Sequence, residues 1–297
     1  MKACVIFNPA ARGEKARHFR DQLAGLSTRV ELKPTYAPGA GRPLAAEAVR
    51  AGFDTIIAAG GDGTLNEVLN GIGDEPDGFQ RVRLGILPLG TINVFARELR
   101  LPTAFPAAWA VLEQGRERIL DLPQVEFQRE GRSERRYFAQ LAGAGLDSRA
   151  IELVNWEQKK LVGPLAYVVA GFKALAEQKP QITITAGQAR HTGELVLIGN
   201  GRYYGGNFEL FPQANLQDGL LDITIFPKVN WEILLRSGWG WLTDQIHQAA
   251  GCHTLQAESF VLAAPEGKVP VEVDGENIGH LPATFSVRRQ TLRVVAP

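Results

Sequence analysis

Residues 55–64 read TIIAAGGDGT and decide the fold of this chain. A short apolar run that stops at glycines is typical of a buried parallel strand, and the segment that begins at Thr64 has the pattern of a helix start. Gly60, Gly61 and Gly63 lack a Cβ atom, so their backbone can reach positive φ and approach a ligand closely. Main-chain N–H groups beside a helix N-terminus then bind phosphate oxygens. The junction therefore predicts a phosphate-binding loop.

Asp62 is the unusual member of this loop. A carboxylate beside a bound phosphate repels it unless a divalent cation or a substrate hydroxyl lies between them. That requirement favours phosphoryl transfer over passive nucleotide binding. The alternative is a simple strand-to-helix turn in which Asp62 caps the helix.

The length and composition indicate an ordinary globular protein. A chain of 297 residues is long for one hydrophobic core, so two domains are expected. With 32 basic and 32 acidic residues the formal net charge is zero, and no global field attracts nucleic acid, so we expect no nucleic-acid partner. Cys4 and Cys252 show neither metal-ligand spacing nor a disulfide framework. Residues 1–8 lack a signal-peptide pattern and no apolar run approaches ~18 residues, which predicts a cytoplasmic protein.

Strand and helix patterns alternate in the first part of the chain. Strands are expected at 3–7, 30–34, 55–59 and 84–87, and helices at 14–26, 43–51, 64–69 and 93–99. Such alternation implies right-handed crossovers and a mostly parallel sheet that is covered on both faces. The loops at Asn8, Gly60 and Gly90 follow strand ends, so they lie along one edge of the sheet, where ligands bind.

After Asp121 the pattern becomes mainly β. Strands are expected at 125–128, 135–142, 182–186, 193–199, 219–226, 259–263, 269–273 and 283–287. A helical insertion is expected over 151–178, and tryptophans at loosely helical spacing mark 231–250. The boundary between the two halves is expected at 121–123.

Seven motifs are spread over nearly the whole chain. They are Asn8 to Gly13, Gly60 to Thr64, Pro88 to Arg97, Gly143 to Asp147, Asn200 to Gly206, Asp218 to Asp222 and Asp274 to Glu276. In order and spacing they resemble the motifs of the diacylglycerol kinase catalytic-domain family. The chain is similar in particular to the soluble bacterial lipid kinases of that family, which are related to sphingosine and ceramide kinases. One departure is Val94, where many relatives place Asp.

The resemblance implies a two-domain architecture. Residues 1–122 would form a doubly wound α/β nucleotide-binding domain like that of phosphofructokinases and NAD kinases, completed by a C-terminal strand over 288–297. Residues 123–287 would form a mainly β sandwich domain for the lipid substrate. The active site would then lie in the cleft between the two domains.

The resemblance also implies ATP and Mg²⁺ as cofactors. Asp62 would approach the Mg²⁺ on the nucleotide, because Mg²⁺ prefers hard oxygen ligands. The predicted nucleotide-binding residues are Asn8, Thr35, Gly60, Gly61, Asp62, Gly63, Thr64, Asn66 and Thr91. For Asn8 a plain turn residue at a strand end is the alternative.

Two acids near the C-terminus are candidates for the catalytic base. Asp274-Gly275-Glu276 follows an apolar run and, judged alone, is typical of a hairpin turn. In the family this motif supplies the acid that accepts or orients the proton of the lipid hydroxyl. We assign Glu276 as the base, with Asp274 as the alternate.

A second metal loop is implied at residues 215–220. By position the ligands of a structural Mg²⁺ would be the Asp218 carboxylate with the carbonyl groups of Asn215 and Leu220. A hairpin turn is the alternative.

The lipid substrate is expected at a membrane surface, which the protein would contact peripherally and transiently. Trp231, Trp239 and Trp241 fit an interfacial anchor, but a structural helix explains them as well. Lysines at 159, 160 and 173 fit either a contact to anionic lipids or a solvated face. A homodimer is a further expectation.

The leading function is an ATP-dependent lipid kinase that phosphorylates the hydroxyl of diacylglycerol or a related lipid. An NAD kinase shares the Gly-Gly-Asp-Gly loop, and a catalytically inactive lipid-binding or regulatory relative would share the fold. Three features favour the lipid enzyme over the NAD kinase: the Asn8-Pro9 start, the Gly90-Thr91-Ile92-Asn93 loop and the Asp274-Gly275-Glu276 motif. Intact Asp62, Asp218 and Glu276 argue against an inactive relative.

Overall fold

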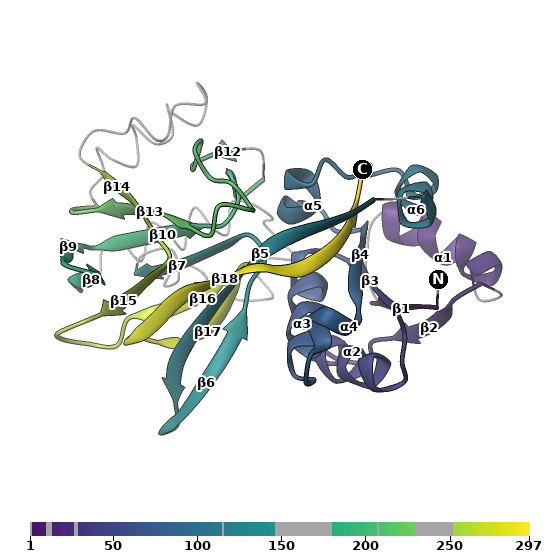
Figure 1. Ribbon diagram of the computed structural model, residues 1–297, viewed down its shortest axis with the longest axis horizontal. Helices are drawn as coiled ribbons and strands as arrows, with labels where there is room; N and C mark the ends of the chain where they lie inside the picture. The colour runs from purple at the N-terminus through teal and green to yellow at the C-terminus, as the bar shows by residue number, and fades with distance from the viewer. Residues whose placement is uncertain are drawn as a thin grey trace.

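The computed structural model describes residues 2–9, 14–26, 29–114, 116–145, 180–206, 208–229 and 252–297. It shows an α/β half and a β half that lie side by side, with the C-terminal strand running from one to the other (Figure 1). The predicted helical segments at 151–178 and 231–250 lie outside the described residues, and so do residues 10–13 of the first motif.

The α/β half contains a parallel sheet in the order β2-β1-β3-β4. These strands are β1 (Ala3–Phe7), β2 (Glu31–Pro34), β3 (Thr55–Gly60) and β4 (Arg83–Pro88). All six residues of β3 are buried, because helices cover both faces of the sheet. The strand and helix alternation predicted from the sequence is confirmed.

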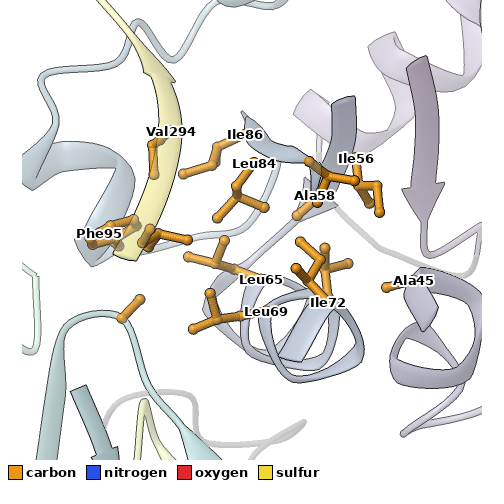
Figure 2. Packing of buried hydrophobic residues seen from close by; sticks show 14 of the residues in the cluster. Ala45, Ile56, Ala58, Leu65, Leu69, Ile72, Leu84, Ile86, Phe95 and Val294 are labelled. Carbon is orange, nitrogen blue, oxygen red and sulfur yellow. The ribbon is translucent and has the colours of Figure 1, made fainter. Parts of the chain in front are cut away.

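Successive residues of each strand pack against different helices. Figure 2 shows Ile56 and Leu84 facing Leu65 and Leu69 of helix α3, with Ala45 of helix α2 nearby. Their chain neighbours pack on the other face against α1 and α6. The helices are α1 (Glu14–Leu26), α2 (Gly41–Arg50), α3 (Asp62–Gly73), α4 (Gly78–Arg81), α5 (Val94–Glu98) and α6 (Phe105–Gln114). Helices α4 and α6 were not among the expected elements.

The β half is a sandwich, as predicted. Its inner sheet has the order β14-β13-β10-β7-β16-β17, and its other layer continues the sheet of the α/β half. Apolar side chains from both layers form one core. The strands of the inner sheet are β7 (Leu141–Gly145), β10 (Leu195–Gly199), β13 (Leu221–Phe226), β14 (His253–Ala257), β16 (Pro270–Val273) and β17 (Glu276–His280). The other layer contains β5 (Arg116–Arg129), β6 (Arg132–Tyr137), β8 (Ile182–Ala186), β9 (Ala189–Gly193), β15 (Ser259–Ala263) and β18 (Ala283–Ala296). A separate hairpin is formed by β11 (Tyr203–Tyr204) and β12 (Phe208–Glu209).

Two long strands join the halves. β5 pairs antiparallel with β18 from Ala283 opposite Phe127 to Ala296 opposite Arg116, and Val294 of β18 also pairs in parallel with Leu84 of β4. The expected boundary at 121–123 therefore lies inside β5 rather than in a linker. The segments expected as a sandwich strand at 283–287 and a returning strand at 288–297 are one strand, with an irregular register between Arg288 and Leu292.

One expected strand is split. The sequence predicts a single strand over 135–142, but the structure has β6 ending at Tyr137 and β7 starting at Leu141. Between them the backbone N–H groups of Ala139 and Gln140 bond to the side chain of Asp274 rather than to a neighbouring strand. A carboxylate from a distant turn thus interrupts the ladder.

Within the described part of the chain, no helix is long and apolar enough to cross a membrane.

Candidate active site

The predicted phosphate-binding loop, residues 60–64, lies where β3 ends and α3 begins. Gly61 is the N-cap of α3 with φ −94° and ψ −170°, and the helix starts at Asp62. The N–H groups of the first helical turn have no acceptor within the helix, so they are available to an anion. The expected use of positive φ at Gly60, Gly61 and Gly63 is wrong, because none of the three adopts it.

These glycines are required by close packing instead. The N–H groups of Leu89 and Gly90 donate to the Gly60 carbonyl at 3.0 and 3.2 Å, so the loops after β3 and β4 touch through their backbones. A Cβ atom on Gly90 would lie 2.5 Å from the Gly61 Cα, and one on Gly60 would collide with the Thr64 side chain. The two glycine loops therefore form one compact backbone surface at the edge of the sheet.

The second loop is held by Asn93. Its side chain donates to the Gly90 carbonyl at 2.7 Å and accepts from the Gly90 N–H at 3.1 Å. Asn93 has φ 55°, a left-handed conformation that asparagine tolerates. Between these two residues Thr91 and Ile92 are exposed. The predicted nucleotide residue Thr91 is therefore accessible beside the phosphate-binding loop.

Asp62 caps a different helix from the one it belongs to. Its carboxylate accepts hydrogen bonds from the backbone N–H groups of Asn93, Val94 and Phe95 at the start of α5. Burial and the nearby Asp274 carboxylate raise the pKa of Asp62 to about 6, and the three backbone donors oppose that rise. Val94 thus contributes its N–H to this contact, while its side chain is buried.

A Mg²⁺ ion fits this site when it is bound to the phosphates of the nucleotide, because the described residues offer it few protein ligands. In the described residues no group of three or more His, Cys, Asp or Glu side chains is placed to hold a metal ion. Three donors already occupy part of the Asp62 carboxylate, so an ion there would take its other ligands from phosphate oxygens and water, as Mg²⁺ commonly does.

Asp274 joins the two halves of the molecule. Its Oδ2 accepts from Asn66 Nδ2 and from the Ala139 N–H, both at 2.8 Å. Its Oδ1 accepts from the N–H groups of Gln140 and Leu141 at 3.0 and 3.2 Å. Burial raises the pKa of Asp274, and these four donors oppose the rise. With both oxygens occupied by protein donors, Asp274 is poorly placed to take a proton from a substrate.

Asn66 serves the same junction. It is buried in α3, and its Nδ2 donates both to Asp274 and to the Tyr137 carbonyl, the latter at 3.2 Å. Asn70, one turn later, donates to the same carbonyl at 2.9 Å and accepts from the Tyr137 N–H. The predicted nucleotide residue Asn66 therefore lies under the site and holds α3 against β6.

Glu276 lies beside the phosphate-binding loop. Its Oε1 is 3.2 Å from the position that a Cβ atom on Gly63 would occupy. The residue is exposed, but the protein around its carboxyl group reduces hydration there. This desolvation and the carboxylates of Glu67 and Asp274 raise the pKa of Glu276 to about 7, and the Arg136 guanidinium opposes that rise. A carboxyl group with a pKa near 7 is suited to accept a proton at neutral pH.

The remaining predicted nucleotide residues, Asn8 and Thr35, directly follow the paired strands β1 and β2. The Thr35 N–H donates to the Phe7 carbonyl at 2.8 Å, which places Thr35 next to Asn8 along the same sheet edge. Asn8 is exposed and Thr35 is half-buried. The structure thus gathers the loops after β1, β2, β3 and β4 at one edge.

Sequence reasoning missed Glu98, which ties α5 to the β half. Its Oε2 accepts from the Arg202 N–H at 2.7 Å, the Tyr203 N–H at 3.3 Å and Gln140 Nε2 at 3.2 Å. A Cβ atom on Gly201 would lie 2.7 Å from this oxygen, so a larger residue there would displace the Glu98 carboxylate from these contacts. In the sequence, only the Asn200–Gly206 motif hinted at this contact. Two of the three donors to Glu98 are backbone N–H groups, which side-chain identity does not reveal.

The Asp218 loop is anchored to β5. The Asp121 carboxylate accepts from the Gly219 N–H at 2.6 Å and from the Gln290 N–H at 2.7 Å. Within the loop, Asp218 Oδ1 accepts from the Leu220 N–H at 2.9 Å. In the described residues Asp218 Oδ2 has no hydrogen-bond partner, so one carboxylate oxygen is free to bind a cation together with backbone carbonyls and water.

We expect a chelator to lower the melting temperature of the wild-type protein in nucleotide-free buffer, because a metal bound only by the native state stabilises it. Asp218→Ala is expected to melt lower and to lose most of that response. Differential scanning calorimetry with and without chelator measures both. An equal shift in the two proteins would place the ion elsewhere, and an unshifted wild type would mean that no structural ion is held.

A cavity of about 400 Å³ lies on the other side of the sheet from these acids. It is lined by Arg17, His18 and Asp21 of α1 and by Phe105 of α6, and it reaches Leu89. Asp62, Asp274 and Glu276 lie instead on the side of α3. The cavity and the acid cluster are therefore separate features.

The chain matches two protein-family models and resembles proteins of known family. A model of the diacylglycerol kinase catalytic domain matches residues 2–125, and a model of the YegS C-terminal NAD kinase beta sandwich-like domain matches residues 140–296. The chain is 33% identical over 307 residues to a diacylglycerol kinase of Staphylococcus saprophyticus, covering 100% of this chain and 95% of that protein. The chain belongs to the diacylglycerol kinase family.

Other members of the diacylglycerol kinase family show the same relation. A diacylglycerol kinase of Staphylococcus aureus is 32% identical over 310 residues, with 100% of this chain and 92% of that protein covered. A crystal structure of a diacylglycerol kinase from Bacillus anthracis superposes with a TM-score of 0.71 at 20% identity and covers 100% of this chain and 97% of that one. At that identity the likeness shows the fold. Membership of a kinase family implies the use of ATP.

Proposed function

We propose that this chain is an ATP-dependent lipid kinase that phosphorylates the hydroxyl group of diacylglycerol or a related lipid. The observation that carries the proposal is the position of Glu276 Oε1, 3.2 Å from the Cβ position of Gly63 in the phosphate-binding loop. A phosphoryl-transfer site needs an acceptor for the hydroxyl proton close to the phosphate. The names of the relatives support a diacylglycerol as the acceptor.

The proposed chemistry uses the N–H groups at the start of α3 together with Asp62 and Glu276. The N–H groups at the start of α3 hold the phosphates of ATP, and Asp62 would meet a Mg²⁺ ion bound to the nucleotide, which would supply charge neutralisation. The Glu276 carboxylate removes the proton of the lipid hydroxyl. The hydroxyl oxygen then attacks the terminal phosphorus, and ADP leaves with the electron pair of the broken P–O bond.

The direct test incubates the purified protein with radiolabelled ATP and a panel of lipids in mixed micelles. We expect label transfer to diacylglycerol or a related lipid alcohol. NAD serves as the control acceptor, because an NAD kinase shares the glycine loop. Transfer of label to NAD and to no lipid would show an NAD kinase instead. Transfer to neither acceptor would indicate a catalytically inactive relative.

The pH dependence of turnover tests the base. Because Glu276 must be ionised to accept a proton and its pKa is about 7, kcat/KM is expected to rise with pH through that region. Glu276→Gln is expected to lower kcat by about 10²-fold or more and to remove this inflection. The inflection of Asp62 near pH 6 should remain in the variant. An unchanged inflection near pH 7 in Glu276→Gln would assign it to another group.

A lipid acceptor also requires contact with a membrane surface. We propose that this contact is peripheral and transient, because the formal net charge is zero and supplies no long-range attraction to anionic lipid. The membrane contacts predicted for the tryptophans at 231, 239 and 241 and for the lysines at 159, 160 and 173 stay predictions, because these residues lie outside the described part of the chain. The homodimer also stays a prediction. Vesicle flotation tests the membrane contact.

A further inference from the structure

Arg136 is held rigidly against the α/β half. It precedes Tyr137 at the end of β6, and Tyr137 is bonded through its N–H and carbonyl to Asn70 and Asn66 of α3. The Tyr137 ring packs on Phe79 with ring centroids 5.2 Å apart. The backbone that carries Arg136 is therefore fixed to the helix that starts at the phosphate-binding loop.

The strand register decides which way the Arg136 side chain points. Arg136 lies opposite Val125 in the β5–β6 pair, and opposed residues of antiparallel strands share one face. Val125 is fully buried in the sandwich core, so Arg136 lies on the inner face, toward the sheet that ends in β17. Its neighbour Arg135 alternates to the outer face. This register directs Arg136, and not Arg135, toward the side of Glu276.

Arg136 is half-buried without a close anion. In the described residues its guanidinium makes no hydrogen bond and no ion pair within 4.0 Å, whereas Arg135 bonds to Glu126 at 2.8 Å and Arg42 bonds to Asp74 at 2.6 Å. Burial and the Arg42 charge lower the pKa of Arg136, and the acids Glu134, Glu276 and Asp74 oppose this from farther away. An unpaired charge in such a place costs free energy that a bound anion would recover.

Among the described residues, the charges that act on Asp62 and Glu276 are mainly those of other carboxylates. Asp274 acts on Asp62, and both Glu67 and Asp274 act on Glu276, so like charges accumulate around the loop. Of the charges that shift the pKa of Glu276, Arg136 is the cation. A phosphate group entering beside Glu276 adds further negative charge, and a guanidinium is the group that binds phosphate oxygens through two parallel hydrogen bonds.

We propose that Arg136 binds a phosphate group of the ligand held at this site. The shared chemistry is a phosphate oxygen pair, supplied either by the nucleotide polyphosphate or by the phosphate ester of a phosphorylated lipid. This inference rests on the proposed function, because it places the phosphate beside Glu276 and the loop at Gly63. The contact would offset the free-energy cost of the half-buried guanidinium. It would also balance the negative charge that the phosphate adds to the nearby carboxylates.

The experiment measures binding rather than turnover. Isothermal titration of wild type, Arg136→Gln, Arg136→Lys and Arg135→Gln uses ADP with Mg²⁺ as one probe. Sedimentation with phosphatidylcholine vesicles, with and without phosphatidic acid, is the other. Arg136→Gln is expected to bind the responding probe about 10- to 100-fold more weakly, the scale of a lost charge-assisted hydrogen bond. Arg136→Lys should lose less, because it keeps the charge but not the planar fork.

Arg135→Gln is the matched control, since it changes the adjacent arginine on the opposite face, which is already paired. It should bind as wild type does, and melting curves confirm that all variants are folded. A loss confined to ADP assigns the nucleotide phosphates, and a loss confined to phosphatidic acid assigns the lipid phosphate. Equal affinity of wild type and Arg136→Gln for both probes overturns the inference while leaving kinase activity of the wild type to stand. A wild type that binds neither probe overturns the inference and the proposed function together.

Discussion

Asp274→Ala is expected to lose about 1.5–3 kcal/mol of its free energy of unfolding, the scale of hydrogen bonds to a charged acceptor that is partly buried. The substitution removes the shared acceptor of four donors, the N–H groups of Ala139, Gln140 and Leu141 and Asn66 Nδ2. Asn66 keeps its hydrogen bond to the Tyr137 carbonyl. Because these groups come from both halves of the molecule, the joint between α3 and the sandwich should loosen. Urea denaturation followed by circular dichroism measures the change.

Glu126→Ala is the control for this result. Glu126 is likewise a carboxylate that accepts hydrogen bonds, but its partner is the exposed Arg135, and exposed ion pairs contribute about 0–1 kcal/mol. Asp274→Asn provides a second variant in case the alanine form does not fold, because it keeps one oxygen and should lose less stability. An Asp274→Ala protein that unfolds within about 1 kcal/mol of wild type would show that the four contacts contribute little.

Asp62→Asn is expected to lower kcat by about 10³-fold while the protein remains folded, the scale of losing a charge placed at a transferred group. The amide keeps the shape of the carboxylate and one acceptor for the N–H groups of Asn93, Val94 and Phe95. It removes the negative charge that meets the nucleotide-bound Mg²⁺. Turnover at saturating ATP and Mg²⁺, with the melting temperature of the same sample, measures both effects.

Asp77→Asn is the matched control for that charge change. Asp77 is an exposed residue before α4 in a left-handed conformation that asparagine also adopts, so turnover and melting temperature should stay at wild-type values. If Asp62 acts only as the cap of α5, its variant should melt lower without a large loss of turnover. Wild-type turnover in Asp62→Asn would remove Asp62 from the catalytic site.

The α/β half was predictable because its signals are local. Continuous apolar runs such as residues 55–59 are buried by helices on both sides, and each run ends at glycine or proline where a loop begins. Strand β5 was seen only in part, because its first residues, Arg116 to Ile119, are mostly exposed and show no apolar alternation. In β18 the polar residues Arg288 to Gln290 interrupt the pattern where the register is irregular.

The candidate site was predicted as a set of motifs but not as a geometry. The motifs place Asp62, Asp274 and Glu276 together, yet they do not distinguish a base from an acid that holds the fold. The structure separates them: Asp274 accepts four protein hydrogen bonds, whereas Glu276 faces Gly63. The difference between two acids that are two positions apart arises from the turn that joins β16 and β17.

By itself the sequence determined the strand and helix alternation, the glycine loops at one edge of the sheet and the family of this chain, because periodicity and motif spacing are properties of neighbouring residues. Only the tertiary structure decided what the acids contact. Asp274 bonds to Gln140, 134 positions away, and Asp62 bonds to the start of α5 through backbone N–H groups. Every residue except proline carries such a group, so these contacts leave no mark on side-chain identity and exist only once the chain has folded.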